Sequence, residues 1–192
     1  MRKRFPPDGV TSSNTASWLT DSEGSAAVEF VLWLAVLILP VLSAIDVGTY
    51  AYKRMLVQIA GQAAVQAAWH TCDSTAGLVP ATKNCPGLLA LVTTAAQATS
   101  LGTAVTTTNA NVTEAYYCAA GQTLTLASGT TGSLTTPLTI GAPNCVASGH
   151  TTAAGDYIKV QVSYAYAPIF SNLSVGPFLT TPITYQAWMR LK

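Results

Sequence analysis

Apolar residues form one long run near the start of this chain of 192 residues. From Gly24 to Asp46 almost every position is apolar, and about 20 such residues are enough for a helix to cross a bilayer. Glu29 is the ionisable residue inside the run, and Pro40 removes one backbone hydrogen bond in its second half. The pattern predicts a membrane-spanning helix over residues 25–46, with a kink at Pro40 and one carboxylate near its start.

The pattern then changes to that of an amphipathic helix over residues 47–71. Polar residues recur every four positions, which places them on one helix face, and mainly alanines occupy the other. The polar face consists of Arg54, Gln58, Gln62, Gln66 and His70, and the apolar face of Leu56, Ile59, Ala60, Ala63, Ala64, Ala67 and Ala68. We expect one helix to continue out of the membrane and to end near Cys72.

The end of the chain alternates between apolar and polar residues, as half-buried strands do. One face carries Ile158, Val160, Val162, Tyr164 and Tyr166 in the first stretch, and Ile183, Tyr185, Ala187, Met189 and Leu191 in the second. We expect the strands at 157–166 and 183–191 to pair antiparallel and to pack on the extramembrane half of the helix. The predicted class is α+β, with a membrane-spanning helix that continues into a small β-containing head.

The region between the helix and these strands gives weaker signals. Asn84 as a cap and Pro86 in the first turn predict a second helix over residues 86–99. Its inward side chains are expected to be Leu88, Leu89, Val92 and Ala96. Short strands are expected at 122–127 and 135–140, where threonine is frequent.

Four cysteines follow the apolar run. They indicate in which cell compartment this part of the chain lies and which disulfide bonds it can form. They are Cys72, Cys85, Cys118 and Cys145, and they show no C-x-x-C pair and no Cys/His spacing of the zinc type. An even number on one side of a membrane favours disulfides in an oxidising compartment over free thiols or a metal site. Three connectivities are open, and we favour Cys72–Cys85 with Cys118–Cys145 because these bonds close the shortest loops.

Charged residues are few in this chain, and their scarcity limits which partners are expected. Charged residues make up 9% of the sequence and the net charge is +1, so there is no basic stripe for nucleic acid. Residues 1–24 are polar, and we expect them to be unstructured. Arg2, Lys3 and Arg4 would hold this end in the cytoplasm. A secretory signal peptide is the rival interpretation, but Leu42 occupies a position where its cleavage site needs a small residue.

Residues of the types used in catalysis are present but dispersed. His70 belongs to the polar helix face, and His150 has no acidic neighbour in the sequence. Asp73, Glu114 and Asp156 show no spacing typical of an acid–base pair. No nucleophile elbow, phosphate-binding loop or metalloprotease motif occurs. We therefore expect no enzyme activity, no cofactor and no metal.

The start of the apolar run resembles the type IV prepilin signature, in which a membrane peptidase cuts after a glycine. A glycine, four uncharged residues, a glutamate and a phenylalanine stand between the polar leader and the rest of the run. The finer resemblance is to the TadE-like family of the tight-adherence (Tad) pilus. It covers GSAAVEFVLWLAVLILPVLSAIDVGTY, including Pro40, Asp46 and Gly48, and a looser resemblance covers residues 157–192.

The resemblance assigns roles to four residues at the start of the run. It implies cleavage after Gly24, which makes Ser25 the new N-terminus, Glu29 the fifth residue and Phe30 the sixth. Glu29 would then pair with the freed amine of Ser25 in a neighbouring subunit, because neither charge is tolerated alone in a low-dielectric environment. Such a pair would favour one axial stagger between helices. The alternative for Glu29 is a position at headgroup depth with no role.

For the whole chain, the resemblance implies a minor pilin or pseudopilin that takes part in assembly or initiation of a Tad-type (type IVc) pilus used in adherence and secretion. The expected partners are the prepilin peptidase, other pilins, platform proteins of the inner membrane and the lipid bilayer. The head, residues 72–192, would be pilin-like and lie in the periplasm or outside the cell. The alternative function is that of an uncleaved single-pass anchor whose head binds a ligand or scaffolds an envelope complex.

Overall fold

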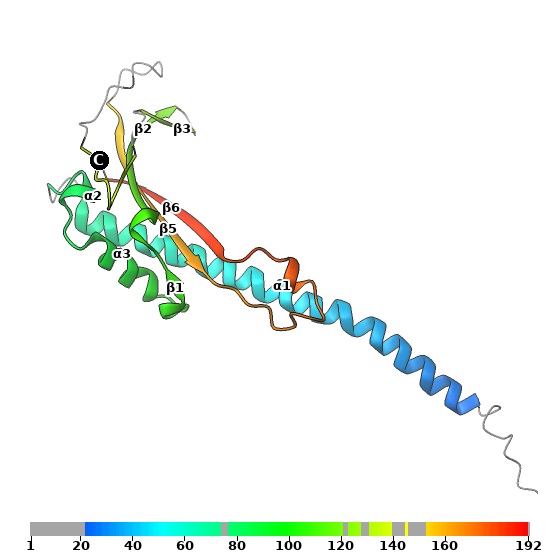
Figure 1. The fold of residues 1–192 in the computed structure, drawn as a ribbon. Coiled ribbons are helices and arrows are strands. Elements are labelled where there is room, and N and C mark those ends of the chain that lie inside the picture. The colour runs from blue at the N-terminus through cyan, green and yellow to red at the C-terminus, as the bar shows by residue number, and fades with distance from the viewer. Residues whose placement is uncertain are drawn as a thin grey trace, which may run out of the picture.

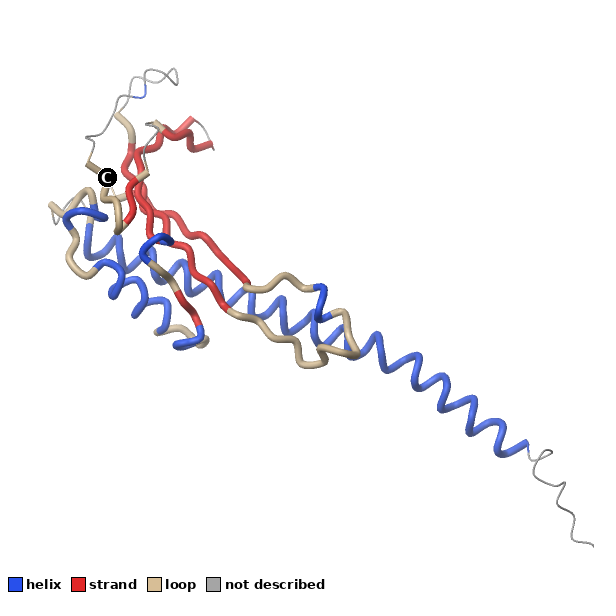
Figure 2. Tube along the Cα trace, in the orientation of Figure 1, coloured by secondary structure: helices blue, strands red, loops and turns tan. Residues whose placement is uncertain are grey.

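The computed structural model consists of one long helix with a small head packed along its second half (Figure 1; Figure 2). The structure describes residues 22–73, 77–120, 123–127, 131–139, 145 and 153–191. Helix α1 (Ser22–Cys72) has 51 residues, and an antiparallel sheet and two further α-helices follow it. The predicted α+β class is confirmed.

Helix α1 ends at Cys72, as predicted, and continues through Pro40 without interruption. The kink expected at Pro40 stays a prediction. The helix begins at Ser22, so the expectation of an unstructured leader is wrong for residues 22–24. The rest of the predicted leader, residues 1–21, lies outside the described part of the chain.

The second half of α1 forms the central element of the head. The fully buried residues on this half are Val57, Ala60, Ala64, Ala68 and Cys72. Most of the predicted polar face is confirmed, because Arg54, Gln62, Gln66 and His70 are exposed and Gln58 is half-buried. Ile59 was expected on the packing face, but it is exposed, because the head covers the opposite side of the helix.

The head contains a sheet built around strand β5. The strands are β1 (Val105–Thr106), β2 (Val112–Ala120), β3 (Thr123–Leu126), β4 (Gly132–Ser133), β5 (Gly155–Tyr164) and β6 (Ile183–Arg190). β6 pairs with one edge of β5, while β1 and β2 pair with the other edge. β3 and β4 both pair with β2. Every pairing among the described residues is antiparallel.

The predicted C-terminal strands are confirmed as β5 and β6, with antiparallel pairing from Tyr157 opposite Arg190 to Tyr164 opposite Ile183. The inward residues Ile158, Val160 and Val162 are fully buried in the same core as the second half of α1. The sheet lies close to the helix at Gly61, where an added Cβ would stand 2.7 Å from Cδ1 of Tyr185. The alternating pattern therefore packs on α1 as expected.

The predicted second helix is confirmed as α3 (Leu88–Gln97), which packs beside α1. Its predicted cap is wrong, because α3 is preceded by Gly87 in the left-handed region at a φ of 70°. Asn84 instead ends the short helix α2 (Ala81–Asn84), and its side-chain amide donates a 3.0 Å hydrogen bond to the carbonyl of Val79. Of the four predicted inward residues, Leu88, Val92 and Ala96 are buried and Leu89 is half-buried.

Sequence patterns gave mixed results for the remaining strands. β3 confirms the strand expected at 122–127. The strand expected at 135–140 is wrong for residues 135–139, where Pro137 has no N–H to donate to a sheet. Strand β2 was not predicted, because its buried residues include Glu114, which interrupts the apolar pattern. β2 is nevertheless the strand that joins β5 to β3 and β4.

Candidate functional site

The first half of α1 extends beyond the head (Figure 1). Its apolar side chains are exposed. Every residue from Gly24 to Val41 is exposed. The exposed large apolar residues here include Val28, Phe30, Val31, Leu32, Trp33, Leu34, Val36, Leu37, Ile38, Leu39 and Val41. Within the described residues, α1 is the one helix long and apolar enough to cross a membrane, with a mean hydropathy of 2.5 over its best window. The segment is therefore suited to contact with lipid or with other helices.

The residues predicted for processing and assembly lie together in the first turns of α1. Gly24 and Ser25 come first, and Glu29 and Phe30 are exposed about one turn later. A Cβ added at Gly24 would meet nothing within 4 Å. A larger side chain at position 24 would therefore not clash with the rest of the fold. Pro40 lies further along the same exposed segment, about 16 Å from Glu29 at 1.5 Å per residue.

Some large apolar side chains are also exposed on α1 beyond the membrane-length run. Tyr52, Met55, Ile59 and Trp69 are exposed on the half of the helix that carries the head. Their spacing places them away from the buried alanines, on the same side of the helix as the exposed Gln62 and Gln66. The outward face of α1 is therefore partly apolar in the head-bearing half, which lies beyond the membrane-length run.

Asp46 joins the two halves of α1 to the loop that precedes β6. Its carboxylate accepts hydrogen bonds from the backbone N–H of Ile169 at 2.9 Å and of Phe170 at 3.2 Å, and from the hydroxyl of Ser174. The backbone carbonyl of Asp46 accepts a 3.1 Å hydrogen bond from Oη of Tyr166. With 0% relative exposure, the carboxylate is buried and well supplied with donors.

Further contacts hold the same loop against α1. Oη of Tyr50 lies 2.6 Å from Oγ1 of Thr180, and Oγ1 of Thr49 lies 3.1 Å from Oη of Tyr166. The rings of Tyr50 and Tyr166 meet edge to face at 5.2 Å. The sequence marked Asp46 only as the end of the apolar run and part of the TadE-like segment. Its partners are more than 120 residues away in the sequence, so no local pattern could reveal this junction.

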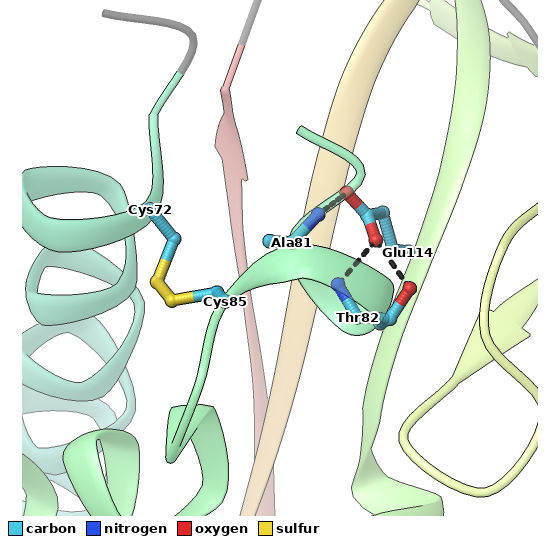
Figure 3. The surroundings of a disulfide bond; sticks show 5 residues. All are labelled: Cys72, Ala81, Thr82, Cys85 and Glu114. Carbon is cyan, nitrogen blue, oxygen red and sulfur yellow. Dashed lines mark hydrogen bonds between the residues drawn. A yellow bond between two sulfur atoms is a disulfide. The ribbon is translucent and has the colours of Figure 1, made fainter. Parts of the chain in front are cut away.

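A second buried carboxylate lies near the far end of α1, close to the Cys72–Cys85 disulfide (Figure 3). Glu114 on β2 accepts hydrogen bonds from the backbone N–H of Ala81 at 2.6 Å and of Thr82 at 2.7 Å. It also accepts one from the hydroxyl of Thr82 at 2.5 Å. No role for Glu114 is predicted from the sequence, but this side chain ties the start of α2 to the sheet.

Both preferred disulfides, Cys72–Cys85 and Cys118–Cys145, are present. The second bond lies in a small core cluster that includes Tyr116. Burial raises the pKa of Tyr116, and the negative charges of Asp156 and Glu114 raise it further. Among the described residues, no group of three or more His, Cys, Asp or Glu is arranged to hold a metal ion. The cysteines therefore serve as covalent ties within the head.

An open groove lies between α1 and β6, and part of the polar helix face lines it. Its lining includes Gln62 and Gln66 from the helix and Tyr185, Gln186 and Trp188 from the strand. Amides line much of this groove, and the described residues there present no nucleophile beside a general base.

Comparison with known proteins gives one result that bears on the apolar helix. Searches of curated proteins and of solved structures returned no match. Residues 24–68 match the model of a protein family described as TadE-like protein. The matched segment begins at the glycine of the prepilin-like signature and extends through the apolar run, Asp46 and most of the head-bearing half of α1. This segment is therefore similar to the TadE-like family, which suggests a protein associated with the Tad pilus.

Proposed function

We propose that this chain is a minor pilin or pseudopilin that takes part in assembly or initiation of a Tad-type pilus. The observation that carries the proposal is that every residue from Gly24 to Val41 on α1 is exposed, and that single apolar side chains such as Tyr52, Met55 and Ile59 are exposed beyond the membrane-length run. A helix that only anchors a head needs apolar contacts within the bilayer, whereas a helix packed among others needs them along its whole length. The TadE-like match over residues 24–68 supports the same role.

Processing after Gly24 is the first step of this proposal. The leader with Arg2, Lys3 and Arg4 stays in the cytoplasm, and the disulfide-bonded head lies on the opposite side of the inner membrane. A prepilin peptidase then cuts between Gly24 and Ser25. The protein acts structurally, through contacts with other pilins and platform proteins in the membrane, and not as an enzyme.

Glu29 supplies the register for helix packing in this proposal. Cleavage creates a positive amine at Ser25, and a neighbouring copy or another pilin presents the Glu29 carboxylate to it. Opposite charges stabilise each other strongly when water is excluded, while either one alone is destabilising. The exposed position of Glu29 on α1 leaves it accessible to a neighbouring helix.

The experiment that tests the proposal is N-terminal sequencing of the protein extracted from membranes of a host with a Tad-type peptidase. We expect the mature chain to begin at Ser25. Gly24→Phe should yield full-length chain only, because a bulky side chain obstructs close approach of the peptidase to the backbone. The open surroundings of Gly24 make this variant harmless to the fold.

A matched control is Gly48→Ala, which also meets nothing within 4 Å and lies outside the cleavage site. This variant should be processed like the wild type. A wild-type chain that keeps Met1 in the presence of an active peptidase would contradict the proposal and favour the uncleaved anchor.

A further inference from the structure

The loop between β5 and β6 exposes a group of large apolar side chains. Phe178 is 88% exposed, and Ile169, Leu173 and Val175 are exposed beside it in the sequence. Burial of such a side chain away from water is favourable. A concentrated apolar group of this kind indicates an interaction surface.

Asp46 fixes the position of this loop along the axis of α1. The backbone N–H groups of Ile169 and Phe170 donate to its carboxylate at 2.9 and 3.2 Å. A helix over residues 25–46 is about 33 Å long, close to the hydrocarbon thickness of a bilayer, about 30 Å. The loop is therefore held where α1 would leave the hydrocarbon layer, as its position beside the middle of α1 shows (Figure 1).

The residues that follow Asp46 on α1 have the composition of a membrane interface. Tyr50 and Tyr52 come within two turns, followed by Lys53 and Arg54. Tyrosine is enriched at headgroup level, and basic side chains reach toward lipid phosphates there. Tyr50 also contacts the loop through Thr180 at 2.6 Å. The loop and this part of the helix therefore belong to one interfacial layer.

We propose that residues 168–179 rest in the outer interfacial layer of the bilayer, with Phe178, Ile169 and Leu173 among the upper parts of the acyl chains. The occupant is lipid because Asp46 holds the exposed loop residues at the end of the apolar span, where Ile45 and Val47 are also exposed. The same loop covers Asp46 and supplies its hydrogen bonds, so the carboxylate meets protein donors instead of lipid. This inference requires α1 to span the membrane, but it depends on neither cleavage nor assembly.

Photocrosslinking in dilute proteoliposomes of phosphatidylcholine tests the proposal. The full chain carries p-benzoylphenylalanine in place of Phe178, and irradiation is followed by mass analysis. We expect an adduct with one phospholipid, at a yield comparable to that of the same probe at Leu34 in the exposed run. The same probe at Leu124 on the distal strand β3, also an exposed leucine, should give no lipid adduct.

A second probe position, Leu173, protects the test against local disturbance at Phe178. A urea unfolding transition equal to that of the wild type shows that each probe variant has folded. Lipid adducts at both positions support the proposal. An adduct with a second copy of the chain in place of lipid, or no adduct at either position while Leu34 reacts, would overturn it.

Discussion

Residues 24–45 and residues 46–72 belong to one uninterrupted helix, but they differ in almost every contact. In the first segment most side chains are exposed and none belongs to the hydrophobic core of the described residues. In the second, small residues such as Ala60, Ala64 and Ala68 are fully buried and allow the sheet and α3 to approach closely. The helical backbone is the same, so the difference comes from side-chain size and from what packs against each segment.

The comparison shows how one helix can both support a head and remain available for assembly. In the second segment the head covers one side of α1, while Tyr52, Met55 and Ile59 stay exposed on the other. Asp46 and the Cys72–Cys85 bond attach the head near the two ends of this segment. The first segment has no such ties, so its stability must come from lipid or from neighbouring helices.

Loss of the Cys72–Cys85 bond should have the largest effect on the head-bearing segment. The double variant Cys72→Ser/Cys85→Ser should lower the free energy of unfolding by about 2–5 kcal/mol, as is typical for small secreted domains. The measurement is urea unfolding in detergent micelles. The helicity of residues 24–45 should persist, because this bond lies at the far end of α1. Unchanged unfolding would show that the bond does not secure the head.

One substitution placed in both segments tests their difference directly. Val57 is 0% exposed and Val31 is 61% exposed on the same helix. Val57→Ala removes buried methyl groups and should destabilise the head by about 2 kcal/mol. Val31→Ala should change unfolding by no more than about 0.5 kcal/mol. Equal losses from both variants, measured by urea unfolding, would remove the distinction between the segments.

A smaller effect is expected from Tyr116 at alkaline pH. Burial and the charges of Asp156 and Glu114 hold its folded-state pKa above the usual value of about 10. The folded state therefore keeps the phenolic proton longer than the unfolded state does. The resulting stability is present below about pH 10 and is lost as pH rises through the folded-state pKa.

Tyr116→Phe is the matched variant for this pH dependence. Unfolding free energies measured from pH 8 to pH 11 should decline less steeply in this variant than in the wild type. Tyr117, whose pKa burial also raises, accounts for part of the decline that remains. Identical slopes in the two proteins would contradict the role given to Tyr116.

Strong periodic patterns allowed the main framework to be predicted from the sequence. The apolar run and the alternating C-terminal strands each repeat one rule over many residues, so α1, β5 and β6 were anticipated. Neighbouring cysteines were correctly paired because short loops are easier to close. The edge strands and the N-cap of α3 were harder to predict from the sequence. The turn at Gly87 and the two-residue strand β4 are too short to produce a recognisable sequence pattern.

The buried acids could not be assigned from the sequence for a different reason. Asp46 and Glu114 are satisfied by backbone N–H groups and hydroxyls that lie far away in the sequence. These donors do not belong to distinctive residue types, so no sequence motif predicts them. The proposed processing residues, Gly24 and Ser25, show the opposite case: their signal is local, and the structure adds only that they are exposed or unobstructed.

The central claim is that the first segment of α1 assembles with other helices through Glu29. The most direct measurement compares Glu29→Leu with the control Val31→Leu in a strain whose own copy is deleted. Glu29→Leu makes the segment more apolar and should insert and be cut after Gly24 normally. It should nevertheless abolish surface pili, because loss of one member of a buried ion pair costs about 3–5 kcal/mol. Val31→Leu should leave both processing and pili intact, and normal piliation by Glu29→Leu would contradict the account.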